Sequence, residues 1–251
     1  MPENPLGWIA DAYETHCLTL AQGVTGRELL MRLGCDAGGV TELADEGEAS
    51  ALQEAALASG ERRGEQQGEE WGAVHAGVVG GWAYALEPGS AWASIDERLA
   101  RASRGARVIC CVNTGPLSHL FYWEDGSLVT EFDAMAPELR AEQGGQDPDR
   151  LVVEMRRVGF FAAEDGTVDD ADERELGLAL LHEVTGVALS DDVTRAGLAG
   201  RIPALYRGPE GPAPEGDEDG PAGDGLVSGA GRPPVDGASL TGTSYGGLAG
   251  K

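Results

Sequence analysis

The sequence predicts an α+β fold, an antiparallel sheet of about five strands packed with helices from both ends of a domain over residues 1–207. Two observations carry this prediction. Strand-like apolar runs joined by turn dipeptides are grouped between residues 73 and 132. Segments with apolar residues at helical spacing lie before and after that group. Grouped rather than alternating helices and strands favour α+β over a parallel α/β sheet.

Helical signals open the chain. A first helix is expected to begin at Asn4, with Pro5 in its first turn. Its apolar stripe is Leu6, Ile9, Tyr13 and Cys17. A second helix is predicted to begin at a capping box formed by Thr25 and Glu28. A weaker, Ala/Glu-rich helix is expected over residues 43–58.

The strand signals follow. Five strands are predicted, over residues 73–79, 82–87, 107–113, 117–124 and 127–132. Gly80-Gly81 joins the first two, and Asp125-Gly126 joins the last two, as two-residue hairpin turns. Ser94 and Glu97 suggest a second capping box and a short helix between the second and third predicted strands. Later helices are predicted over residues 147–158 and 170–185 and from residue 190.

The composition changes at Gly208, and the remaining residues, up to Lys251, are dominated by Gly, Pro, Asp and Glu. Such a segment buries too little apolar surface to offset its conformational entropy, so we expect a disordered tail. Residues 238–251 differ because they contain no acidic residue. Their larger side chains are Leu240, Tyr245 and Leu248. One interpretation is a short docking peptide, and the other is a terminus without a role.

Charge limits the classes of partner. The net charge is −25, which repels phosphate backbones and anionic lipids, so neither nucleic acid nor a membrane is an expected partner. A basic protein partner is favoured, although an acidic surface also serves solubility alone. The N-terminus lacks the basic and apolar regions of a signal peptide. We therefore expect a cytoplasmic protein with reduced cysteines, and the oligomeric state stays open.

Motifs for metal, cofactor or nucleophilic chemistry are missing from the sequence, so no metal and no cofactor are expected. Cys110 and Cys111 are adjacent on a predicted strand and should point to opposite faces, as two small core residues. His182-Glu183 begins like a zinc-protease helix, but position 186 is glycine rather than the second histidine. The only lysine is Lys251, which excludes a phosphate-binding P-loop. The histidines are interpreted as structural or surface residues.

Aromatic residues offer one further signal. The set comprises Trp8, Tyr13, Trp71, Trp82, Trp92, Tyr122 and Trp123. Most should lie in the core, and an exposed remainder could form a partner-binding face.

Several separated motifs then resemble an uncharacterised actinobacterial domain family of unknown function. They are the Trp8-Ile9 helix, Cys17-Leu18-Thr19-Leu20, Gly80-Gly81-Trp82, Ser103-Arg104-Gly105, Phe121-Tyr122-Trp123 and Thr185-Gly186-Val187. The resemblance spans roughly residues 5–200 and implies no particular chemistry. A weaker likeness, at the level of fold alone, is to the immunity-type domains of bacterial toxin systems, which neutralise a partner by binding it.

These observations favour a non-catalytic protein-binding module. An immunity or defence function is one role that such a module could have. One alternative is an enzyme whose site has no readable motif. Its weak candidates for acid–base chemistry are His119, Glu87, Asp133 and Arg104. Another alternative is a cargo protein that its C-terminal tail directs into a shell or complex.

Overall fold

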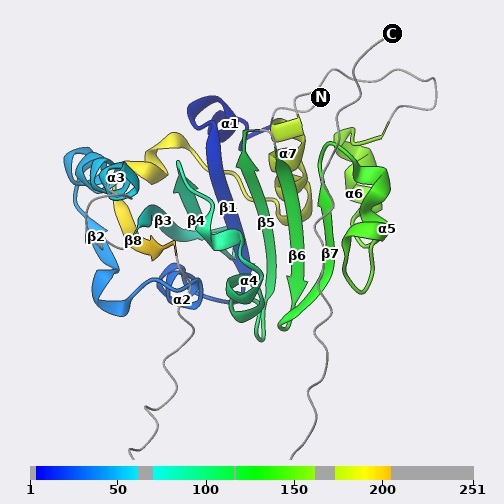
Figure 1. Cartoon of the computed structure of the whole chain (residues 1–251), viewed down its shortest axis with the longest axis horizontal. Coiled ribbons are helices and arrows are strands. Elements are labelled where there is room, and N and C mark those ends of the chain that lie inside the picture. Colours follow the sequence, from blue (N-terminus) through cyan, green and yellow to red (C-terminus); the bar gives the residue numbers. More distant parts are fainter. Residues whose placement is uncertain (1–3, 62–69, 116, 162–172, 205–251) are drawn as a thin grey trace, which may run out of the picture. The chain divides into compact units, whose positions relative to one another are not determined.

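The computed structural model describes residues 4–61, 70–115, 117–161 and 173–204. Within this part of the chain, eight strands form one antiparallel sheet in the order β2-β8-β3-β4-β1-β5-β6-β7 (Figure 1). The strands are β1 (Thr15–Gln22), β2 (Thr41–Leu43), β3 (Trp71–Val79), β4 (Trp82–Pro88), β5 (Arg107–Thr114), β6 (Ser118–Glu124), β7 (Ser127–Asp133) and β8 (Gly197–Pro203).

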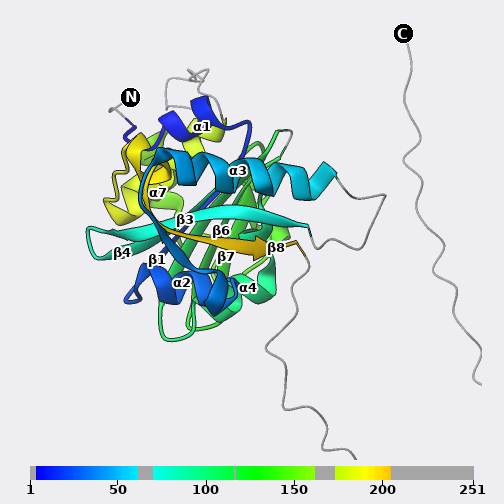
Figure 2. The same cartoon turned by 90° about the vertical axis from the view of Figure 1, so that its left-hand side faces the viewer.

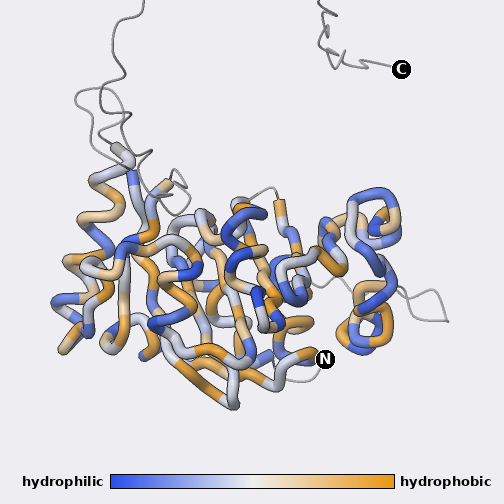
Figure 3. The backbone as a smooth tube through the Cα atoms, turned by 90° about the horizontal axis from the view of Figure 1, so that it is seen from below, coloured by the Kyte–Doolittle hydropathy of each residue, from blue (hydrophilic) through white to orange (hydrophobic). Residues whose placement is uncertain are grey.

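Two layers of helices cover the sheet. Figure 2 shows α1 (Trp8–Ala12), α3 (Glu46–Glu61) and α7 (Glu173–Thr185) on one side of the strands, and α2 (Gly26–Arg32) and α4 (Asp96–Ala102) on the other. Residues of α6 (Val152–Val158) pack into the same core as α1 and α7. The short α5 (Arg140–Gln143) lies against the edge strand β7. The helical segments carry mixed hydropathy along the chain (Figure 3), as expected of helices with one buried face.

The α+β class and the antiparallel sheet are confirmed, but the expected count of about five strands is wrong. The three additional strands are β1, β2 and β8. Strand β1 lies at the centre of the sheet, between β4 and β5, and six of its eight residues are buried. A strand buried on both faces shows no polar alternation, so its short apolar run gives little strand signal. The edge strand β2 has only three residues, and β8 contains two glycines.

The first helix is also shorter than expected. Tyr13 adopts an extended conformation (φ −134°, ψ 114°) and ends α1, while Cys17 lies on β1 instead of continuing the helical stripe. The capping box expected at Ser94 and Glu97 is wrong, because Ile95 precedes α4 and the Ser94 hydroxyl donates to the Ala91 carbonyl.

The later helices lie where the sequence predicts them, but their lengths differ from the prediction. Residues 147–151 form turns before α6 begins at Val152. The segment after residue 190 forms the 3₁₀ helix η4 (Asp191–Thr194) rather than an α-helix. The described part of α7 begins at Glu173. No helix in the described ranges has the length and apolar character needed to cross a membrane.

Both hairpin predictions are confirmed. Gly80 and Gly81 have φ of +58° and +83°, and Asp125 and Gly126 have φ of +47° and +80°. These positive angles are those that a two-residue turn between antiparallel strands requires. Cys110 and Cys111 do point to opposite faces, since each belongs to the core on a different side of the sheet. The predictions for Leu240, Tyr245 and Leu248 lie outside the described residues.

The cap of α2 gives a modest stability prediction. The Thr25 hydroxyl accepts a hydrogen bond from the Glu28 backbone N–H at 3.1 Å, while the Glu28 carboxylate pairs with Arg32 at 2.6 Å. Thr25→Ala should therefore lower the free energy of unfolding by about 1 kcal/mol, and Thr25→Ser by much less, in urea titrations. Equal stability of the alanine variant and the parent chain would show that the cap contributes nothing.

Candidate functional site

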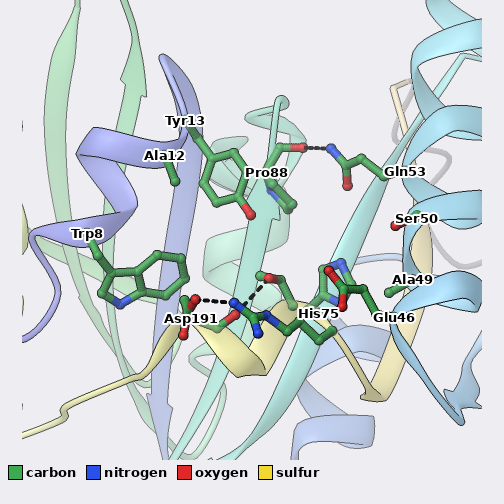
Figure 4. Close-up of a pocket in the computed structure, with 12 residues that line it drawn as sticks. Trp8, Ala12, Tyr13, Glu46, Ala49, Ser50, Gln53, His75, Pro88 and Asp191 are labelled. Atoms are coloured by element: carbon green, nitrogen blue, oxygen red, sulfur yellow. Dashed lines mark hydrogen bonds and ion pairs between the residues drawn. The ribbon is translucent and has the colours of Figure 1, made fainter.

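A cleft of about 320 Å³ opens between α1, α3 and η4, above strands β3 and β4 (Figure 4). We call it the His75 cleft. Its lining residues are Trp8, Ala12, Tyr13, Glu46, Ala49, Ser50, Gln53, His75, Pro88, Asp191, Thr194 and Arg195. These residues come from segments far apart in the sequence, which the sheet brings to one place.

The aromatic wall is held by α1 and the residue that ends it. The Trp8 ring is fixed by a hydrogen bond from its Nε1 to the Leu189 carbonyl at 2.8 Å. Tyr13 lies edge-on to Trp8, with ring centroids 6.3 Å apart and planes inclined by 67°. Both side chains are half-buried, so each keeps part of its ring accessible.

The opposite wall is one face of α3. Glu46, Ser50 and Gln53 follow helical spacing and line the cleft together. Asp45 begins the helix by accepting a hydrogen bond from the Glu48 backbone N–H at 3.1 Å. Gln53 anchors the middle of the helix to the sheet, because its Nε2 donates to the Pro88 carbonyl at 2.7 Å.

The floor of the cleft is His75, on the face of β3 that α3 covers. Its side chain is only 1% exposed, and its buried Nδ1 has no hydrogen-bond partner within the described ranges. Burial lowers the pKa of His75 to about 4, so the ring is neutral at pH 7. An unsatisfied buried polar atom costs about 1–3 kcal/mol, and such costs are concentrated at functional sites.

Negatively charged side chains outnumber positively charged ones in the lining of the cleft. Asp191 and Arg195 form an exposed ion pair with each other on η4 and the turn that follows it. Glu46 adds a second carboxylate on the first turn of α3. With His75 neutral, the charged lining residues leave the cleft with a net negative charge.

This arrangement suits recognition of a cation better than bond-breaking chemistry. Accessible aromatic rings and a carboxylate around a concave site bind ammonium or guanidinium groups. The Thr194 hydroxyl donates to the Asp191 carbonyl at 3.0 Å, which is the bond of a structural turn. Across the described ranges, no group of three or more His, Cys, Asp or Glu residues is arranged to hold a metal ion.

Two of the four residues proposed from the sequence for acid–base chemistry lie together. His119 on β6 and Asp133 on β7 are directly opposed in the sheet register. Glu131 is also close, with its Oε2 3.9 Å from the His119 Nε2. Burial lowers the pKa of His119, and the negative charges of Asp133 and Asp96 act in the opposite direction.

The other two candidates lie apart from this pair. Glu87 is buried on β4, three strands away from β6, or about 14 Å at ordinary strand spacing. It accepts hydrogen bonds from the Ser90 hydroxyl and from the backbone N–H groups of Trp92 and Ala93, at 2.8–2.9 Å. Arg104 is exposed just after α4. None of the four residues lines the His75 cleft.

Sequence reasoning missed most of this cleft. Trp8 and Tyr13 belong to the aromatic set that was expected to leave an exposed remainder, so that signal was present. His75 carries no local motif, and Glu46 and Arg195 look like ordinary surface charges in the sequence. Only the order of strands in the sheet places them around one cleft.

A model for a family of unknown function, DUF6461, matches residues 6–197 of the chain. The match covers nearly the range over which the sequence motifs resemble a family without known chemistry. No curated protein and no solved structure matches the chain.

Proposed function

The chain belongs to DUF6461, a family of unknown function, and we propose that it is a non-catalytic binding module that holds a basic segment of a protein partner in the His75 cleft. One observation carries the proposal. The cleft combines accessible aromatic rings, an excess of negative charge and a buried histidine nitrogen that has no hydrogen-bond partner among the described residues.

The size of the cleft supports a side chain as its occupant. A volume of about 320 Å³ is at the lower end of the range of ligand pockets, which favours one long side chain over a large cofactor. Trp8 and Tyr13 would contact the aliphatic stem and the charged head of an arginine or lysine. Glu46 would pair with the charge.

The overall charge supports a basic partner. A net charge of −25 attracts positively charged proteins over distances comparable to the Debye length, which raises their association rate at low salt. Neutralising a toxin or effector by binding, as immunity-type domains do, is a role that this chemistry would serve.

Removing the Glu46 charge tests the proposal. In calorimetric titrations with an eight-residue peptide that contains one arginine, Glu46→Gln should weaken binding about tenfold, because a charge-assisted contact is lost. Raising the salt from about 50 to 300 mM should weaken binding to the parent chain.

The matched control is Glu142→Gln, which removes one exposed carboxylate from α5, outside the cleft. It changes the net charge equally and should alter the affinity less than about twofold. Equal losses for both variants, or no preference for the arginine peptide over a neutral one, would contradict the proposal.

A further inference from the structure

A second cleft, of about 340 Å³, lies along the C-terminal half of α3. It shares Gln53 and Pro88 with the His75 cleft, so the two are adjacent. The hydrogen bond from Gln53 to Pro88 marks the point where they meet.

The same three structural elements line both clefts in register. Along α3, the lining residues form one helical face: Glu46, Ala49, Ser50, Gln53, Ala56, Leu57 and Gly60. Along β3, His75 lies in the first cleft, and Ala73 and Trp71, at alternate positions of the same strand face, lie in the second. Where α1 leads into β1, Tyr13 lines the first cleft and Thr15 the second. The two clefts therefore follow one direction, along α3.

Their lengths fit an extended peptide. The face of α3 from Glu46 to Gly60 spans about 21 Å at 1.5 Å per residue. From His75 to Trp71, β3 advances about 13 Å, which equals four residues of an extended chain. Residues four apart in an extended chain also point to the same side.

The second cleft differs in chemistry from the first. Leu57 is 57% exposed although it is apolar, and Trp71 and Trp92 are half-buried. Gly72 allows Ser90 and Trp92 to pack closely against β3, because a Cβ at this position would lie 2.9 Å from Ser90 Cβ and 3.2 Å from Trp92 Cδ1. An accessible leucine beside two tryptophans suits an apolar side chain.

Building on the proposed function, we propose that the two clefts form one groove that binds an extended segment of the protein partner. A basic residue of that segment occupies the His75 cleft. An apolar residue four positions away occupies the second cleft and packs against Leu57 and Trp71. The partner is assigned by charge complementarity at one end of the groove and by exposed apolar surface at the other.

The Gln53 side chain, which links α3 to β4 where the two clefts meet, also suits the binding of an extended segment. Its Nε2 is engaged by the Pro88 carbonyl, and its Oε1 makes no hydrogen bond within the part of the chain that the structure describes. That oxygen is a ready acceptor for a backbone N–H of the bound segment as it passes between the clefts.

Peptides of one length and charge test the spacing. Eight-residue peptides carry one arginine and one leucine separated by two, three, four or six positions, with serine and glycine elsewhere, and are titrated calorimetrically against the full chain. Separation by four should bind best, about tenfold more tightly than a peptide with arginine alone. Separation by three should be weaker, because the two side chains then point to opposite sides.

Leu57→Ser should abolish the gain from leucine and leave the affinity for the arginine-only peptide unchanged. Leu139→Ser is the matched control, since it removes another exposed leucine, which is 44% exposed and lies outside both clefts. Arginine peptides that all bind equally, with or without leucine, would overturn the single groove and leave the proposed function intact. Failure of every arginine peptide to bind would overturn both.

Discussion

Replacing Glu87 by alanine is expected to lower the free energy of unfolding by about 3–5 kcal/mol, a large share of the stability of a single domain. The Glu87 carboxylate is fully buried, and Ser90, Trp92 and Ala93 donate three hydrogen bonds to it. The fully buried Arg98 adds a favourable charge interaction. Truncation leaves those three donors without their acceptor and removes the negative charge that offsets the buried Arg98 guanidinium.

Guanidinium titration at pH 7.5 checks this prediction. Glu87→Gln should be less damaging, because its amide oxygen can still accept one or two of the three hydrogen bonds. Glu138→Ala, at an exposed position of the 3₁₀ helix η3 (Pro137–Leu139), should change stability by less than about 0.5 kcal/mol. A loss below about 1 kcal/mol for Glu87→Ala would contradict the structural role assigned to this carboxylate.

His75→Leu is expected to make the protein more resistant to acid. The pKa of His75 falls from 6.5 in the unfolded chain to about 4 in the folded chain because of burial. Between these values the unfolded state binds more protons, so stability declines as the pH falls from 6.5 towards 4. The total decline from this one group is about 3 kcal/mol, and it is absent in the leucine variant.

The measurement compares the free energies of unfolding of the two proteins at pH 7.5 and pH 4. Burial also raises the pKa values of Glu87, Glu131 and Asp96, and their contributions are common to both proteins and cancel in the comparison. Ser50→Ala, a substitution in the same cleft that removes no titratable group, serves as the control and should keep the pH dependence of the parent chain. A parallel decline of the parent and His75→Leu would show that His75 is not held neutral by the fold.

Elements with local turn chemistry could be predicted from the sequence. Gly80-Gly81 and Asp125-Gly126 define hairpins because few other residues tolerate the positive φ angles that these turns need. The opposite orientation of Cys110 and Cys111 also follows from local geometry, since successive residues of a strand alternate.

Elements that depend on distant partners could not be predicted. Strand β1 gains its place only from β4 and β5, which flank it, and β8 is paired with β2 and β3, from remote segments. Cys17 could equally belong to a helical stripe until those partners are known. The helical spacing of the apolar residues favoured a longer first helix, but pairing with β4 and β5 places Cys17 on strand β1.

The candidate site was hidden for the same reason. Trp8 and Tyr13 stood out as aromatic residues, but His75 became notable only because the sheet buries it beneath α3, where its Nδ1 has no hydrogen-bond partner in the described part of the chain. His119 and Asp133 were two of four separate candidates, and the sheet register makes them neighbours, yet no sequence feature placed Glu131 beside them.

The most direct test of the account is an NMR titration of the ¹⁵N-labelled full chain with the peptide that carries arginine and leucine four positions apart. Binding in the groove predicts amide shift changes concentrated in residues 8–15, 46–60, 71–75, 88–92 and 191–195, with small changes elsewhere. Changes centred on His119 and Asp133 or on residues 238–251, with the His75 cleft unaffected, would contradict it.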